Sequence, residues 1–128
     1  MPFEERKKLQ EPDPYPERPV RFSLAKCDTG SFCIKMLEKN ELQAFYKRLG
    51  YFEQLTWKQA VQMPRENGIS IDKKDGIVAR LLSPRLPGLT YGHFRVNGTD
   101  SNIRIFIGRD RDLAKIVFID RGGTLQHQ

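Results

Sequence analysis

Five side chains in the last third of the chain have the chemistry that RNA cleavage requires. Attack of a ribose 2′-hydroxyl on the adjacent phosphate needs a base for the hydroxyl, positive charge on the phosphate and an acid for the leaving 5′-oxygen. Histidine titrates in the range that suits acid or base work, and arginine supplies charge without exchanging a proton. The candidate catalytic residues are His93, Arg104, Arg121 and His127, and Arg95 is a further candidate phosphate ligand.

The charge of the chain also favours a phosphate-bearing partner. The 128 residues include 22 Lys and Arg against 16 Asp and Glu, which gives a formal net charge of +6. Residues 1–79 contribute +2 of this charge. Residues 80–128 contribute +4, with eight basic side chains, seven of them Arg, against four acidic ones. Guanidinium groups fork onto phosphate oxygens, so nucleic acid is the first partner to consider. Ordinary surface charge that keeps the protein in solution is the alternative.

The alternation of residue types in two predicted strands places candidate RNA ligands on one face. Three isoleucines between residues 103 and 107 alternate with Arg104 and Phe106, so the isoleucines point towards the helices and these two point away. Phe94 and Val96 can likewise face the core. Arginine on the opposite face can bind phosphate and rings can stack on bases, although antiparallel sheets also have faces that are merely solvated. The side chains expected to be exposed there are Tyr91, His93, Arg95, Arg104 and Phe106.

Two candidates lie outside these strands. Arg109 falls in a charged turn, Gly108–Asp112, and is a further candidate for RNA binding. His127 could complete the site if the chain after Arg121 folds back over the sheet. A frayed chain end is the alternative for His127.

The helices that must position this face can be recognised from their ends. Capping-box spacing marks two helix starts, and Gly50 is the expected end of the first helix. The predicted αα-hairpin covers residues 40–63, with the capping pairs Asn40–Gln43 and Thr56–Gln59.

The remaining elements are predicted to be strands. The segment 64–90 is rich in turn signals, with 77–82 as a strand or a helix within it, and 32–37 is ambiguous in the same way. The resulting order β-α-α-β-β-β predicts an α+β fold, with the αα-hairpin on one face of a mostly antiparallel sheet. The strands are expected over residues 20–24, 91–96, 103–107 and 113–120. Ile103, Ile105, Ile107 and Phe118 are expected to pack against Leu42, Phe45, Leu49 and Trp57.

Length and composition set the domain organisation. A chain of this length forms one domain, which we expect over residues 20–128. Residues 1–19 hold five of the eight prolines and many charges, so they are expected to form a flexible tail. No run of 18 apolar residues predicts a membrane span, and the first residues lack the apolar stretch of a secretion signal. We therefore expect a cytoplasmic protein with no membrane partner.

Metal and disulfide chemistry is not indicated. The two cysteines, Cys27 and Cys33, lie six residues apart, and His93 and His127 are the only histidines of the chain. A zinc site would need more ligands near the cysteines, and free thiols are the expectation for a cytosolic chain. We expect neither a metal ion nor another cofactor.

The element order and one segment resemble a known superfamily. The run HFRVNGTDSNIRIFIGRDRDLAKIVFIDRGGTLQH contains a basic strand, an arginine inside the next strand and an apolar strand that closes on an arginine. This pattern resembles the RelE/ParE/HigB toxins of toxin–antitoxin pairs, over residues 20–128. The segment FSLAKCDTGSFCIKMLEKNELQAFYKRLGYFEQLTWKQ is also similar to small proteins encoded beside phage and plasmid genes.

The resemblance implies a RelE-like fold and a hydrolase that cleaves mRNA. Members of the RelE branch are ribosome-dependent endoribonucleases that need no metal and are silenced by an antitoxin protein. By position, Arg104 would be the phosphate-binding arginine within a strand, and Arg121 would stabilise the transition state. His127 stands where RelE has a tyrosine, and His93 and Arg95 would belong to the strand that contacts the RNA backbone.

The chain also departs from the superfamily pattern. The long Lys-rich helix of ribosome-dependent members is reduced here to Lys47, Arg48 and Lys58, and the Pro-rich tail is not typical. Two alternatives therefore stay open beside the endoribonuclease. One is a non-catalytic protein that binds RNA or the ribosome with the same face, and the other is a toxin that blocks a protein target such as gyrase.

Overall fold

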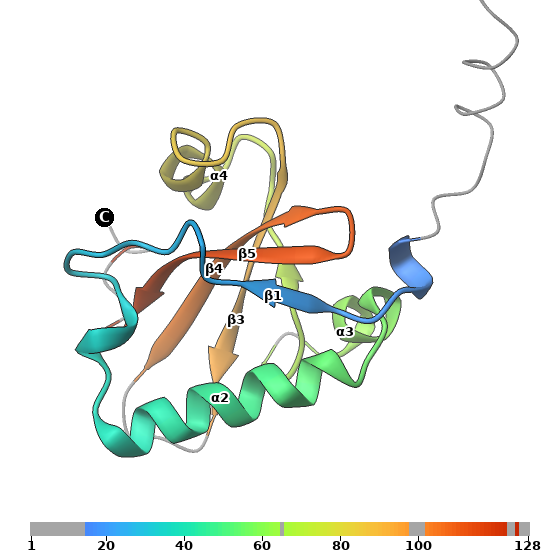
Figure 1. Ribbon diagram of the computed structural model, residues 1–128. Coiled ribbons are helices and arrows are strands. Elements are labelled where there is room, and N and C mark those ends of the chain that lie inside the picture. Colours follow the sequence, from blue (N-terminus) through green and yellow to red (C-terminus); the bar gives the residue numbers. More distant parts are fainter. Residues whose placement is uncertain (1–14, 65, 98–101, 123–124, 126–128) are drawn as a thin grey trace, which may run out of the picture.

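The protein has an α+β fold in which helices cover both sides of one sheet. A computed structural model describes residues 15–64, 66–97, 102–122 and 125. Within them, Figure 1 shows helix α2 below the sheet and helix α4 above it. The elements in chain order are η1 (Tyr15–Glu17, a 3₁₀ turn), β1 (Arg21–Ser23), η2 (Ile34–Met36, 3₁₀), α2 (Lys39–Glu53), α3 (Trp57–Gln62), β2 (Ser70–Ile71), α4 (Ile77–Leu82), β3 (Thr90–Val96), β4 (Ile103–Asp110) and β5 (Leu113–Asp120).

The sheet is mixed, with the strand order β1-β5-β4-β3-β2. The first strand pairs in parallel with the last, and all other neighbours are antiparallel. The strands β3 and β5 match their predicted ranges within one residue. The predicted turn at Gly108–Asp112 is wrong in its extent, because β4 continues to Asp110 and pairs it with Leu113. The tight turn between them places Arg111 at φ 61°.

The two helices of the predicted αα-hairpin are present as α2 and α3, but α2 begins and ends at other residues than predicted. Its capping box is formed by Glu38 and Glu41, not by Asn40 and Gln43. The helix also continues through Gly50 to Glu53. A glycine inside a helix costs only about 1 kcal/mol, and Phe52 is fully buried one half-turn later. Burial of the Phe52 ring therefore outweighs the tendency of Gly50 to end the helix.

The second helix of the layer begins as its sequence predicts. Thr56 caps α3 and accepts a hydrogen bond from the Gln59 N–H, and the Gln59 side chain accepts one from the Thr56 N–H. The chain before β1 packs here, since the Trp57 N–H donates to the Arg18 carbonyl at 3.0 Å and Pro19 pairs with Thr56. The predicted tail therefore has an ordered end next to α3, and its residues 1–14 lie outside the described part.

The core on the α2 side follows the predicted alternation. The strand residues that face α2 are fully buried against the rings of Phe45, Phe52 and Trp57. Leu42 and Leu49 pack at the margin of this core. The buried strand residues on this side are Phe94, Val96, Ile103, Ile105, Ile107, Ile116 and Ile119.

The opposite face corrects two predictions. It carries a second buried cluster under α4, so Tyr91, His93 and Phe106 are buried where exposure was expected. Phe118 also belongs to this second cluster and not to the core below α2. The cause is α4, which buries Val78, Ala79 and Leu82 against the sheet. A six-residue helix is too short for periodicity to show which surface it covers.

Candidate active site

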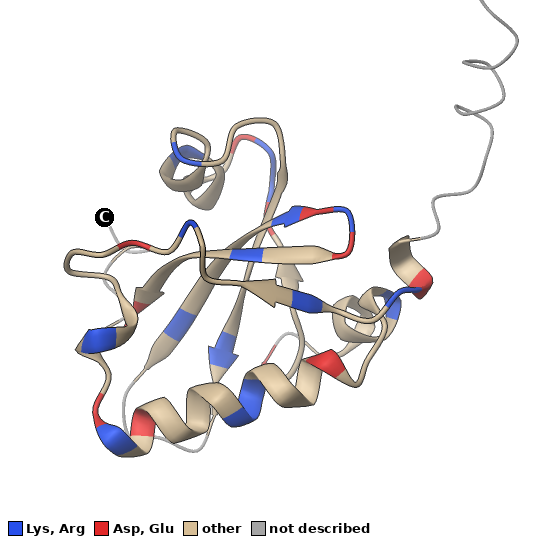
Figure 2. Cartoon of the chain, viewed as in Figure 1, with Lys and Arg blue, Asp and Glu red and all other residues tan. Residues whose placement is uncertain are grey.

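A row of charged residues crosses the sheet at one end of the face that α4 partly covers. Arg95 on β3 is the register partner of Arg104 on β4, and Arg104 is the register partner of Asp120 on β5. Register partners share a face of an antiparallel sheet, so these three side chains lie beside one another. Figure 2 shows the basic positions of β3 and β4 as neighbouring bands. Both arginines are partly exposed, although the Nε atom of Arg104 is buried.

Asp120 lies at the inner end of this row. Its side chain is buried, and it accepts a hydrogen bond from the Leu125 N–H at 2.9 Å. This contact ties the chain after β5 back to the end of the strand. His127 lies two residues further on and is outside the described residues, so its predicted role as an acid stays a prediction.

His93, one of the two histidines of the predicted set, is paired with an aspartate. His93 is 4% exposed, and its Nδ1 lies 2.9 Å from Oδ2 of Asp72. Its ring is packed beside that of Phe106, with centroids 5.9 Å apart. The imidazole is therefore held on one side by a carboxylate and on another by an aromatic ring. Arg95 follows two residues later on the same face of β3, about 7 Å along the strand.

A close approach of two backbones creates this pair. The two-residue strand β2 pairs with β3 so that Ser70 is opposite His93 and Ile71 opposite Gly92. A Cβ atom on Gly92 would lie 2.5 Å from the Ser70 carbonyl oxygen, so only glycine permits this spacing. The Asp72 N–H then donates to the Tyr91 carbonyl at 2.8 Å. This bond places the Asp72 side chain next to His93.

A pocket opens beside the pair, at the edge of the sheet formed by β2. Its volume is about 340 Å³, which is within the range of small-molecule sites. Four apolar side chains and three polar ones surround it, a mixture that is common in ligand pockets. The lining residues are Val61, Met63, Ile69, Ser70, Ile71, Asp72 and His93.

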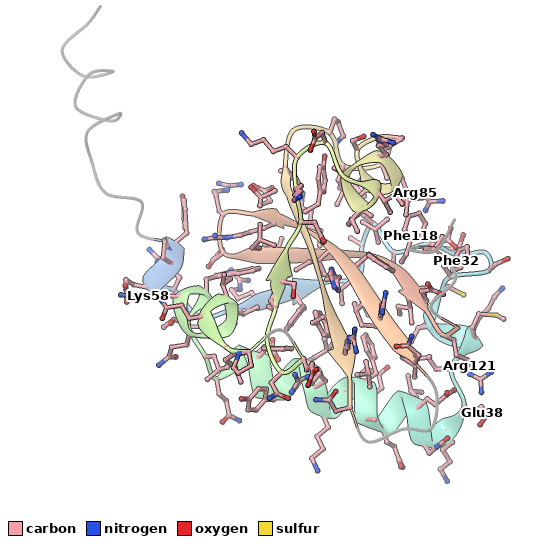
Figure 3. All side chains as sticks on the ribbon, turned by 180° about the vertical axis from the view of Figure 1, so that it is seen from behind. Phe32, Glu38, Lys58, Arg85, Phe118 and Arg121 are labelled. Atoms are coloured by element: carbon pink, nitrogen blue, oxygen red, sulfur yellow. The ribbon has the colours of Figure 1, made fainter. Side chains whose placement is uncertain are left out.

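Arg121 does not share the face of Arg104, contrary to our expectation. Its Nε donates to both carboxylate oxygens of Glu41 at 2.7 and 2.9 Å, and an Nη lies 3.2 Å from Glu38. These carboxylates belong to the start of α2, on the other side of the sheet, and Figure 3 shows Arg121 beside Glu38. Hydrogen bonding to Glu41, with its negative charge, raises the pKa of Arg121. Two carboxylates therefore already neutralise this guanidinium.

The three remaining candidates for RNA binding are not on an open surface with Arg95. The Tyr91 hydroxyl donates to the Leu86 carbonyl, and Phe106 is fully buried, so neither ring can stack on a base. Arg109 lies over the Trp57 ring at 4.5 Å, on the face that α2 and α3 cover. The structure thus places His93, Arg95 and Arg104 on one face of neighbouring strands and directs Arg109 and Arg121 to the other side of the sheet.

The far part of the upper face is closed by a cluster of rings and charges. Arg85 stacks on Phe118 at 4.8 Å and bonds to Asp28 at 2.9 Å, and Phe32 meets Phe118 edge-on (Figure 3). The hydrogen bond from the Phe32 N–H, together with Arg85, lowers the pKa of Asp28. This cluster covers the face around Phe118, whereas Arg95 and Arg104 stay partly exposed.

Among the described residues, no three His, Cys, Asp or Glu side chains are grouped so that they could hold a metal ion. Cys27 and Cys33 are both free thiols, and burial, together with the charge of Cys33, raises the pKa of Cys27. A raised pKa makes a thiol a poor nucleophile near neutral pH. The described part of the chain also contains no helix that is long and apolar enough to cross a membrane.

Two residues of the site were missed by sequence reasoning. Asp72 has a detectable signal, because the residues from Ile69 to Asp72 alternate with a period of two inside a segment interpreted as loop. No sequence pattern indicates the role of Glu41, since its partner Arg121 lies 80 residues away. Comparison with known proteins adds nothing to either, because no protein-family model, no curated protein and no solved structure matches the chain.

Proposed function

We propose that the protein is a RelE-like toxin of a toxin–antitoxin pair that cleaves mRNA. Its active site is the end of the sheet face where His93, Arg95 and Arg104 meet. The observation that carries this proposal is their arrangement. The buried imidazole of His93, with its carboxylate partner, is on the same face of β3 as Arg95, and Arg104 lies opposite Arg95 on β4. The resemblance to the RelE branch further implies that the enzyme is cytoplasmic and that an antitoxin protein inhibits it.

The element order supports the RelE-like assignment. The first strand, two helices and three antiparallel strands β3 to β5 follow one another as the resemblance implies. Strand β2 and helix α4 are additional elements between α3 and β3. Asp72 directly follows β2, and α4 covers part of the upper face, so these elements distinguish this chain from the simple β-α-α-β-β-β pattern.

The reaction needs only groups that the chain and the RNA supply. Arg95 and Arg104 bind the scissile phosphate and the phosphate beside it, and His93 takes the proton from the adjacent 2′-hydroxyl. The 2′-oxygen bonds to phosphorus, the bond from phosphorus to the 5′-oxygen breaks, and the 5′-oxygen takes up one proton. His127 is the proposed donor of that proton. The products are a 2′,3′-cyclic phosphate and a 5′-hydroxyl, so neither water nor a metal ion is consumed or required.

Cleavage by the purified full chain tests the proposal. A 5′-labelled mRNA is incubated with the protein, with and without ribosomes, and the product ends are identified as cyclic phosphates. Arg104→Ala should slow cleavage by about 10²–10³-fold, the scale for one preorganised charge donor. Arg111→Ala is the control, because it removes the same charge from an exposed turn.

The outcomes separate the three functional classes. RNA binding that weakens with salt but yields no cleavage would favour a non-catalytic RNA-binding or ribosome-binding protein. Toxicity in cells without affinity for RNA would favour a toxin that blocks a protein target such as gyrase. Either result would overturn the endoribonuclease.

A further inference from the structure

We infer that the pocket at the β2 edge holds the nucleotide whose 2′-hydroxyl reacts, and that Asp72 is the positioning residue that keeps His93 ready to accept its proton. The inference rests on the proposed function and identifies the substrate subsite within it. It places the acceptor of the 2′-hydroxyl proton on β3, beside the β2 edge of the sheet, while the proposed proton donor His127 follows β5 in the chain.

The first step is the tautomer of His93. An ionised carboxylate can only accept hydrogen bonds, so the contact of 2.9 Å requires Nδ1 of His93 to carry the proton that Asp72 accepts. In a neutral imidazole, Nε2 is then the unprotonated nitrogen. Asp72 thus leaves the ring with a basic Nε2, the form that a general base needs.

The second step is the rigidity of the pair. His93 is packed against Phe106 and buried to 4% exposure, and the Asp72 backbone is bonded to Tyr91. Catalytic groups need their rotamers fixed by packing and by supporting hydrogen bonds. The pair has both the packing and the supporting hydrogen bonds, although β2 itself has only two residues.

The third step is the match between the pocket and a nucleotide. Val61, Met63 and Ile71 offer apolar surface for a base or for the ribose ring. The polar side chains of Ser70, Asp72 and His93 lie along its strand side. The phosphate that follows this ribose would lie towards Arg95, which is two residues along β3 from His93. A single nucleotide of RNA can therefore engage the pocket and the arginines together.

The tautomer is measured without any assay of activity. The chain has two histidines, so a long-range ¹H–¹⁵N spectrum of the ¹⁵N-labelled protein shows two imidazoles, and His127→Gln identifies His93. We expect the neutral imidazole of the wild type to carry its proton on Nδ1 and not on Nε2, and this preference to be lost in Asp72→Ala. A neutral wild-type His93 imidazole with its proton on Nε2 overturns the inference, and no variant needs to fold for that result.

Cleavage then tests whether the pair acts in the reaction. Asp72→Ala should lower the single-turnover cleavage rate by roughly 10²-fold or more, within the range of general acid–base catalysis, without weakening RNA binding. Asp75→Ala is the matched control, because it removes the same charge from an exposed position in the same loop and should leave cleavage within about twofold. Equal rates for the two variants overturn the role of Asp72.

A pocket-filling variant tests the subsite. Val61→Trp should slow cleavage because the side chain at position 61 lines the pocket, while the tautomer of His93 stays as in the wild type. Unchanged cleavage in this variant overturns the pocket as the nucleotide site. A wild-type protein that shows the expected tautomer but cuts no RNA instead overturns the proposed function, so the two failures are distinguishable.

Discussion

Arg95 and Arg104 give the most direct test of RNA binding, because they are register partners on neighbouring strands. A single RNA strand that crosses the sheet can contact both. Each phosphate contact to a single strand adds about 0.7 to the slope of log affinity against log salt. Two contacts therefore contribute about 1.4, which corresponds to a loss of affinity of about sevenfold between about 50 and 200 mM salt.

Each single substitution should remove half of this salt dependence. Arg95→Ala and Arg104→Ala are each expected to lower the slope by about 0.7. Over the same range of salt, the contribution of this pair to the loss of affinity then falls from about sevenfold to about 2.6-fold. The assay is fluorescence anisotropy with a labelled 2′-O-methyl RNA, which binds but cannot be cleaved. Thermal melts check that each variant is folded.

Arg109→Ala is the matched control for this experiment. It removes the same charge from the same strand as Arg104, but its side chain lies over Trp57 on the other face of the sheet. Its slope should equal that of the wild type. If all three variants lose the same slope, net charge alone drives binding. If none of them changes it, RNA does not contact this end of the sheet.

Three further predictions concern stability. Ile105→Ala should destabilise the protein by about 2–5 kcal/mol in denaturant unfolding, because a fully buried side chain leaves a cavity. Arg121→Ala should lower the melting temperature because it leaves the Glu41 carboxylate buried without its guanidinium, and Glu41→Gln in the same chain should recover part of that loss. Asp28 has a lowered pKa, with the Phe32 N–H as the largest cause, so its contribution is present above its unfolded pKa and disappears as the pH falls through the folded one. In Asp28→Asn, stability should therefore depend less on pH over this acidic range.

The faces of the central strands could be predicted from the sequence. Alternation with period two assigns each side chain of a strand to one of two faces, and this placed Ile105 below the sheet and Arg104 above it. The same argument put His93 and Arg95 on the side of Arg104. These assignments depend only on local pattern, and they are confirmed.

Contacts between distant segments could not be predicted in this way. Glutamate is not among the preferred N-cap residues, so Asn40 was the expected start of α2. The helix begins at Glu38 instead, in a capping box with Glu41, whose carboxylate also binds Arg121 from the end of β5. That interaction joins residues 80 positions apart, and no periodic pattern can reveal it.

The cover of the upper face likewise depends on tertiary packing, and it changes what the face can do. An open face with Tyr91, Phe106 and the arginines would suit loose binding of many RNA bases. The observed packing removes both rings from the surface and leaves accessible cations at one end.

On this covered face, His93 lies between the Phe106 ring and the Asp72 carboxylate. Phosphate contacts supply most of the affinity of a surface that only binds RNA, and they do not require a buried imidazole with a carboxylate partner. A catalyst does gain, since proton transfer requires a base of fixed orientation and tautomer. The arrangement of this one side chain is therefore the reason to favour cleavage over binding alone.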